Sequence, residues 1–141
     1  MIPVWYHLSN MKLINRNVDY AVRALVFMAR ANKPTVSVTQ MQTEVGVARP
    51  FLRKILQKLH KAGLLQAVKG KGGGFALART PASIRLSDLA AALQGPFKLN
   101  DCVFRKKLCL HHGACVLRHK ISAIETRMLS EIEGITVKDL V

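Results

Sequence analysis

Residues 50–79 read PFLRKILQKLHKAGLLQAVKGKGGGFALAR, and this stretch decides the fold. Its first half has apolar residues at the spacing of an amphipathic helix, which predicts a helix over 50–62 that ends at Gly63. Its second half predicts two short strands, 64–68 and 75–78, around a glycine-rich tip that contains Lys69 and Lys71. A helix followed directly by a basic hairpin is typical of a winged helix.

The polar side of the predicted helix is mostly basic and consists of Arg53, Lys54, Gln57, Lys58 and Lys61. It has no Asp or Glu, so ion pairs along the helix do not account for its positive charge. A shorter helix, 39–45, precedes it across Gly46, with Ser37 and Thr39 as candidate N-caps. This is the helix-turn-helix arrangement, in which the second helix enters the DNA major groove. The residues expected to contact DNA are Thr39, Arg49, Pro50, Arg53, Lys54, Lys58, Lys69, Lys71, Gly72 and Gly73.

The net charge of +14 is concentrated in the first part of the chain. Residues 1–80 contain 13 Lys and Arg against two acidic residues, whereas residues 81–141 contain nine against six. Double-stranded DNA is the partner that such a field favours, because neutralising phosphates releases counterions. We expect Arg49 and Arg53 to reach base edges and the lysines to meet phosphates.

Helices are also predicted on either side of this module. Residues 18–31 are apolar all round, which predicts a buried first helix, and Ser87 is the expected cap of a short helix over 88–93. A long amphipathic helix, 116–132, follows, and its apolar seam favours dimerisation over packing on its own domain. The seam residues are Leu117, Ile121, Ile124 and Met128.

The predicted fold class is therefore mainly α with a small β-hairpin wing, a winged helix-turn-helix plus a long C-terminal dimerisation helix. We divide the chain into a candidate extension (1–10), the DNA-binding domain (11–80), a short helix with a cysteine loop (81–115), and the dimerisation helix with its tail (116–141). No stretch is apolar enough to predict a membrane span, and residues 1–10 lack the features of a signal peptide.

Cys102, Cys109 and Cys115 are the only cysteines of the chain and lie in one segment, DCVFRKKLCLHHGAC. An odd number of cysteines without a signal peptide favours a reducing, cytoplasmic location and argues against a fully paired disulfide framework. Metal ligation or redox sensing is the better interpretation. No combination of nucleophile and base indicates an enzyme.

The chain resembles the IscR/NsrR/RirA/CymR superfamily of bacterial winged-helix regulators from Met11 to its C-terminus. The resemblance rests on MKL with DYAVRAL (11–13 and 19–25), FLRKILQKLHKAGLL (51–65), KGKGGGFALAR (69–79), IRLSDLAAALQG (84–95) and the three cysteines. The glycine-rich wing is the most specific of these motifs. The resemblance implies a homodimer that represses or activates transcription on a palindromic operator.

The resemblance also implies an iron–sulfur cluster, 2Fe–2S in preference to 4Fe–4S, held by Cys102, Cys109 and Cys115. Asp19 matches the position from which some members donate a fourth ligand across the dimer. His119 lies one residue beyond the position of a ligating histidine in other members, while His111 and His112 match no ligand of the family. The first cysteine spacing, C-x6-C, is one residue longer than in familiar members, and Ala48-Arg49 replaces the usual Ser or Thr at the start of the recognition helix.

Two other functions remain open at this point. The first is a winged-helix regulator without a cluster, controlled by thiol oxidation or by a protein partner. The second is a zinc protein with a Cys₃His site, although the ligand spacings are wide for a zinc knuckle. The signal could be nitric oxide, iron, redox state or cluster status.

Overall fold

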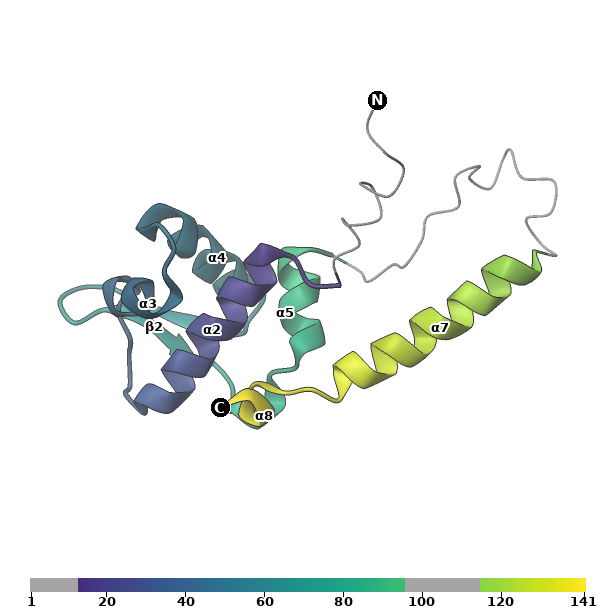
Figure 1. The fold of residues 1–141 in the computed structure, drawn as a ribbon. Coiled ribbons are helices and arrows are strands. Elements are labelled where there is room, and N and C mark those ends of the chain that lie inside the picture. The colour runs from purple at the N-terminus through teal and green to yellow at the C-terminus, as the bar shows by residue number, and fades with distance from the viewer. Residues whose placement is uncertain (1–12, 96–114) are drawn as a thin grey trace, which may run out of the picture.

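Helices form most of the fold, and a two-stranded hairpin completes it (Figure 1). The computed structural model describes residues 13–95 and 115–141, so the candidate extension, Cys102, Cys109 and the loop histidines lie outside the described residues. The predicted mainly α class with a β-hairpin wing is confirmed. The elements are α2 (Arg16–Ala31), α3 (Val38–Val45), α4 (Arg49–Lys61), β1 (Leu65–Val68), β2 (Gly74–Leu77), the 3-10 turn η1 (Pro81–Ser83), α5 (Leu86–Leu93), α7 (Val116–Glu133) and α8 (Val137–Leu140).

Helix α2 begins two residues before the predicted start. The side chain of Asn15 caps it by accepting a hydrogen bond from the amide of Val18, at 3.0 Å. Asn32 ends it in the left-handed conformation. The prediction of a fully buried helix is wrong, because Arg16, Arg23 and Arg30 form an exposed side opposite the buried apolar residues.

The core lies where α2, α3, α4 and α5 meet. Each helix contributes apolar side chains that are almost fully buried, and no polar or charged side chain of the described ranges is buried with them. Burial of this apolar area drives the assembly of the four helices. The largest fully buried side chains include Leu25, Met41, Leu52, Leu56, Leu59 and Leu89.

The wing is attached to the linker between α2 and α3. Strands β1 and β2 are antiparallel, with Leu65 opposite Leu77 and Val68 opposite Gly74. Val36 of the linker forms a bridge with Phe75, and their amides and carbonyls are paired at 2.9 Å in both directions. Gly74 makes this approach feasible, because a Cβ atom there would lie 2.2 Å from the Val36 carbonyl oxygen.

The C-terminal end of the chain returns to the helical body (Figure 1). Helix α7 runs away from the body at its N-terminal end, and after Glu133 the chain turns back so that α8 packs near α2 and η1. The Leu86 amide donates to the Ile135 carbonyl, and the Val137 amide donates to the Ile84 carbonyl, each at 2.9 Å. The Thr136 backbone amide and hydroxyl, which donate to the Asp139 carboxylate, lower the pKa of that carboxyl group.

The predicted cap of the short helix is wrong. Helix α5 begins at Leu86, so Ser87 lies inside its first turn, and Arg85 occupies the N-cap position. The Asp88 carboxylate, in the first turn of the helix, accepts a hydrogen bond from the Arg85 amide at 3.0 Å. This bond pairs an amide at the helix start that would otherwise have no partner within the helix. Of the helices in the described ranges, none has the length and apolar character needed to cross a membrane.

We expect Gly74→Ala to detach the wing from the linker. The added methyl group would force the Val36 carbonyl away and break the two hydrogen bonds of the bridge, at a cost of at least about 2 kcal/mol. The measurement is the free energy of unfolding by urea, with amide exchange at Val36 and Phe75.

Gly70→Ala is the matched control. Gly70 also has a positive φ, of 97°, but open space surrounds its Cβ position, so only a backbone cost of about 1–2 kcal/mol is expected. Equal losses in the two variants, with the exchange of Val36 and Phe75 unchanged, would contradict the role assigned to Gly74.

Candidate nucleic-acid interface and cysteine segment

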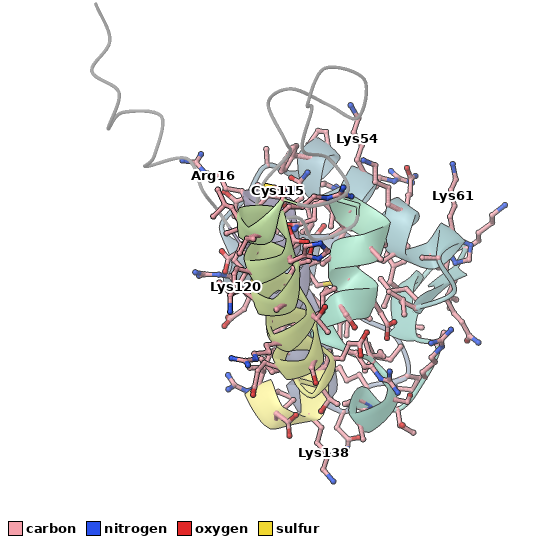
Figure 2. The ribbon with its side chains drawn as sticks, turned by 90° about the vertical axis from the view of Figure 1, so that its right-hand side faces the viewer. Arg16, Lys54, Lys61, Cys115, Lys120 and Lys138 are labelled. Carbon is pink, nitrogen blue, oxygen red and sulfur yellow. The ribbon has the colours of Figure 1, made fainter. Side chains whose placement is uncertain are left out.

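Helix α4 exposes its basic side to solvent. Its apolar side is buried against the core through Leu52, Ile55, Leu56 and Leu59. Figure 2 shows Lys54 and Lys61 pointing away from the body. All the α4 residues predicted to contact DNA are exposed, namely Arg49, Pro50, Arg53, Lys54 and Lys58.

The start of α4 has no capping side chain. Ala48 occupies the N-cap position and makes no side-chain hydrogen bond, while Pro50 fixes the first turn. The positive end of the helix dipole therefore adds to the charge of Arg49. The ring of Phe51, which is 42% exposed, meets Tyr20 of α2 edge to face with 6.0 Å between ring centroids, and this contact supports the first turn of α4.

Helix α3 leads into α4 through a tight turn. Ser37, one of the two candidate caps, is the N-cap, and Gln40 completes a capping box. Thr39 therefore lies in the first turn of α3 with its side chain exposed. Gly46 ends α3 in the left-handed conformation, at φ 73°, and allows the chain to turn toward α4.

The wing tip carries the remaining predicted contacts. Lys69, Lys71 and Gly72 are exposed, and Gly73 is half-buried. A Cβ atom at Gly73 would lie 2.4 Å from the Val68 carbonyl oxygen, so the turn requires glycine there. The structure thus places all the predicted DNA contacts on α3, α4 and the wing tip.

The segment that forms α4 and the wing contains no acidic residue of its own. Between Glu44 and Asp88 the sequence has nine Lys and Arg and no Asp or Glu. This stretch includes all of α4, β1 and β2. Its positive field is therefore continuous along the chain, which suits a polyanion such as DNA.

Two exposed residues of α4 were placed on its polar side by sequence but were not counted among the contacts. Gln57 and Lys61 lie in one row with Pro50 and Lys54, at spacings of four, three and four residues, which fall on one side of a helix. Gln57 is the neutral hydrogen-bonding member of this row, and Gln side chains pair well with adenine. This spacing was available in the sequence.

Of the candidate cluster ligands, Cys115, Asp19 and His119 lie within the described residues. Cys115 is a free thiol at the N-cap of α7 (Figure 2), and His119 is exposed on the first turns of that helix. The Asp19 carboxylate accepts a hydrogen bond from Nε of Arg23 at 3.1 Å, and both side chains are more than half exposed. Because two of the three cysteines lie outside ranges 13–95 and 115–141, those ranges contain no group of three candidate ligands.

Gln94 makes a long-range contact that sequence reasoning missed. Its side-chain oxygen accepts from the Asn15 amide at 3.0 Å, and its side-chain nitrogen donates to the Leu13 carbonyl at 3.1 Å. The end of α5, just before the cysteine segment, is thereby joined to the start of α2, which carries Asp19. No pattern in the sequence signals a contact between residues that are 79 and 81 positions apart.

Comparison with known proteins agrees with this geometry. The chain is 29% identical over 131 residues to a putative HTH-type transcriptional regulator of Aquifex aeolicus (strain VF5), a match that covers 92% of this chain and 91% of that protein. Its fold is similar to that of CymR (YrzC), the global cysteine regulator of B. subtilis, with a TM-score of 0.77 and 19% identity over 92% and 96% of the two chains.

The fold is also similar to that of T. potens IscR, with a TM-score of 0.72 and 24% identity over 94% of this chain and 88% of that one. The family model described as Rrf2, iron-dependent transcriptional regulator, matches residues 14–141, which is nearly the whole chain. The chain therefore belongs to the Rrf2 family of transcriptional regulators.

Proposed function

We propose that this protein is a cytoplasmic, homodimeric regulator that binds a palindromic DNA operator and changes its DNA affinity with the state of an iron–sulfur cluster. The observation that carries the DNA part is the basic, exposed side of α4 beside a basic wing, with no carboxylate between Glu44 and Asp88. In this proposal α4 enters the major groove and the wing lysines meet the phosphate backbone.

The homodimer in this proposal forms through α7. Leu117 and Ile124 are 68% and 51% exposed and Ile121 is half-buried on the same side of the helix, whereas Met128, at the other end of the seam, packs against the core of its own chain. An apolar side on a helix that leaves the body suits a second copy of the same helix. Two recognition helices related by two-fold symmetry would then read the two halves of a palindrome.

Cys102, Cys109 and Cys115 would hold the cluster through their thiolates, with Asp19 as the fourth ligand. Iron–sulfur clusters are commonly held by thiolates, and 2Fe–2S is the favoured type here. The described donors suit this role, because Cys115 is a free thiol and the Asp19 carboxylate is exposed. The ion pair that Asp19 would give up is a surface pair, which contributes at most about 1 kcal/mol.

The arrangement of α7 favours donation of Asp19 by the partner subunit. Figure 1 shows the N-terminal end of α7, next to Cys115, pointing away from α2 of the same chain. A ligand on α2 would meet that end of α7 more readily across a dimer that forms along α7. His119, on α7 itself, is the second candidate for the fourth ligand.

A regulator without a cluster, switched by oxidation of its thiols, is the second candidate function. The fold resembles the oxidized form of Staphylococcus aureus CymR, with a TM-score of 0.63 and 21% identity, and Cys115 is available for such chemistry as a free thiol. The three clustered cysteines favour the first candidate.

The wing lysines provide a test of DNA binding. We expect Lys69→Ala with Lys71→Ala to weaken binding on cognate and random duplexes alike, because phosphate contacts carry no sequence information. The slope of log K against log salt should become shallower by about 2. The measurement is fluorescence anisotropy from low to moderate salt.

Lys138→Ala is the matched control for the wing variant. Lys138 is an exposed lysine on α8, far from Lys54 and Lys61 in Figure 2. Its loss should leave the salt slope unchanged. A loss of binding confined to the cognate operator in the wing variant would argue against the phosphate role.

The α7 seam provides a test of the homodimer. We expect Ile124→Asp to yield monomers, because it would bury an unpaired carboxylate in each half of the interface. Ser130→Asp is the control, since Ser130 is exposed on the opposite side of the helix. The measurement is the molar mass of each variant by light scattering. An Ile124→Asp protein that stays dimeric would exclude this seam as the interface.

Anaerobic purification tests the cluster. We expect a coloured wild-type protein with matching iron and acid-labile sulfide, and a Cys109→Ala protein that has lost both. A wild-type protein that stays colourless after reconstitution would overturn the cluster and favour the thiol switch. Zinc without sulfide would instead identify a Cys₃His site.

A further inference from the structure

The wing tip is held by a side chain that lies outside the hairpin. The hydroxyl of Thr35, in the linker between α2 and α3, donates a hydrogen bond to the Gly72 carbonyl at 3.1 Å. The next residue, Val36, pairs with Phe75 through two backbone hydrogen bonds of 2.9 Å. The linker therefore holds the wing at two levels, at β2 through Val36 and at the tip through Thr35.

The tip has little else to fix its direction. Within the turn, the Gly73 amide donates to the Gly70 carbonyl at 3.0 Å, while Lys69, Gly70, Lys71 and Gly72 are exposed. Glycines lose more conformational freedom on ordering than any other residue. An isolated two-stranded hairpin is also only marginally stable in water. A contact from outside the hairpin thus has a large share in holding this turn.

We propose that Thr35 is a positioning residue for DNA binding, which holds the wing tip at the angle at which Lys69 and Lys71 meet the DNA backbone. This inference rests on the proposed DNA role of the wing. The linker is continuous with α2 and α3, and α3 leads directly into α4. The Thr35 contact therefore fixes the wing tip relative to the recognition helix rather than relative to the hairpin alone.

Positioning of this kind acts through preorganisation. A wing that is already at its binding angle loses less conformational freedom when DNA binds, so the same lysine–phosphate contacts give a higher affinity. Loss of the Thr35 contact should therefore weaken binding without changing the number of phosphates contacted. The salt slope should stay the same, in contrast to the effect of removing the lysines.

The hydrogen bond between Thr35 and Gly72 can be removed by substitution with little effect on global stability. Thr35 is half-exposed and Gly72 is exposed, so water can replace the hydroxyl at the Gly72 carbonyl, and global stability should change little. Thr35→Val keeps the shape of the side chain and removes the donor. Thr35→Ser keeps the donor and should restore the wild-type behaviour.

Thr126→Val is the matched control. The Thr126 hydroxyl donates to the Ser122 carbonyl at 3.0 Å on the exposed side of α7, so this variant loses a bond of the same chemistry, made within one helix that is not part of the proposed DNA surface. We expect wild-type affinity and wild-type exchange of the wing amides in this variant.

The experiment combines DNA affinity, its salt dependence, hydrogen exchange of the amides of residues 70–73, and thermal unfolding on the full-length protein. For Thr35→Val we expect a two- to tenfold loss of affinity, about what one hydrogen bond contributes. The salt slope and the unfolding midpoint should be unchanged, and exchange at the wing tip should be faster.

Three results would overturn the inference: wild-type affinity in Thr35→Val, weakened binding with unchanged wing exchange, or failure of Thr35→Ser to restore binding. The wing lysine variant separates this inference from the proposed function. If loss of Lys69 and Lys71 has no effect on binding, the DNA role of the wing fails. If that loss weakens binding while Thr35→Val does not, the Thr35 role alone fails.

Discussion

Burial of one side of α4 is the constraint on which the rest of the molecule depends. Leu52, Leu56 and Leu59 are completely buried, and α4 cannot rotate about its axis without exposing them. The same packing fixes the opposite, basic side in solvent. The wing is then set beside that side by β1, which follows α4 after a short turn, and by the linker that pairs with Phe75. The proposed DNA surface is thus a consequence of core packing.

Much of this fold could be predicted from sequence, because its strongest signals are local. The apolar spacing of α4, the breaking glycines at 46 and 63, and the glycine-rich tip each report a backbone requirement of their own neighbourhood. Starts of helices were harder to predict where the cap was unusual. Asn15 caps α2 ahead of two polar residues. At α5 the capping hydrogen bond comes from Asp88 in the first turn of the helix, so the prediction of Ser87 as the cap was plausible but wrong.

The candidate site likewise combines residues that local sequence patterns predict with contacts between distant segments that they do not predict. The basic residues of α4 follow from a periodic pattern and those of the wing from its glycine-rich tip, and the structure exposes both sets. The Gln94, Thr35 and Val36 contacts join segments that are 37 to 81 residues apart, and neither spacing nor composition encodes them. Ligation at the cysteine segment depends on a second subunit in the proposed function, which one chain cannot specify.

The return of the chain after α7 has a consequence for the dimer proposed above. The backbone pairing of residues 135–137 with residues 84–86 clamps one end of an arm that is roughly 27 Å long, at 1.5 Å for each of its 18 residues. In the proposed dimer, two such arms joined along their length would set the distance between the two recognition helices. The separation of operator half-sites would then depend on this backbone junction, and side chains there would govern operator spacing rather than base preference.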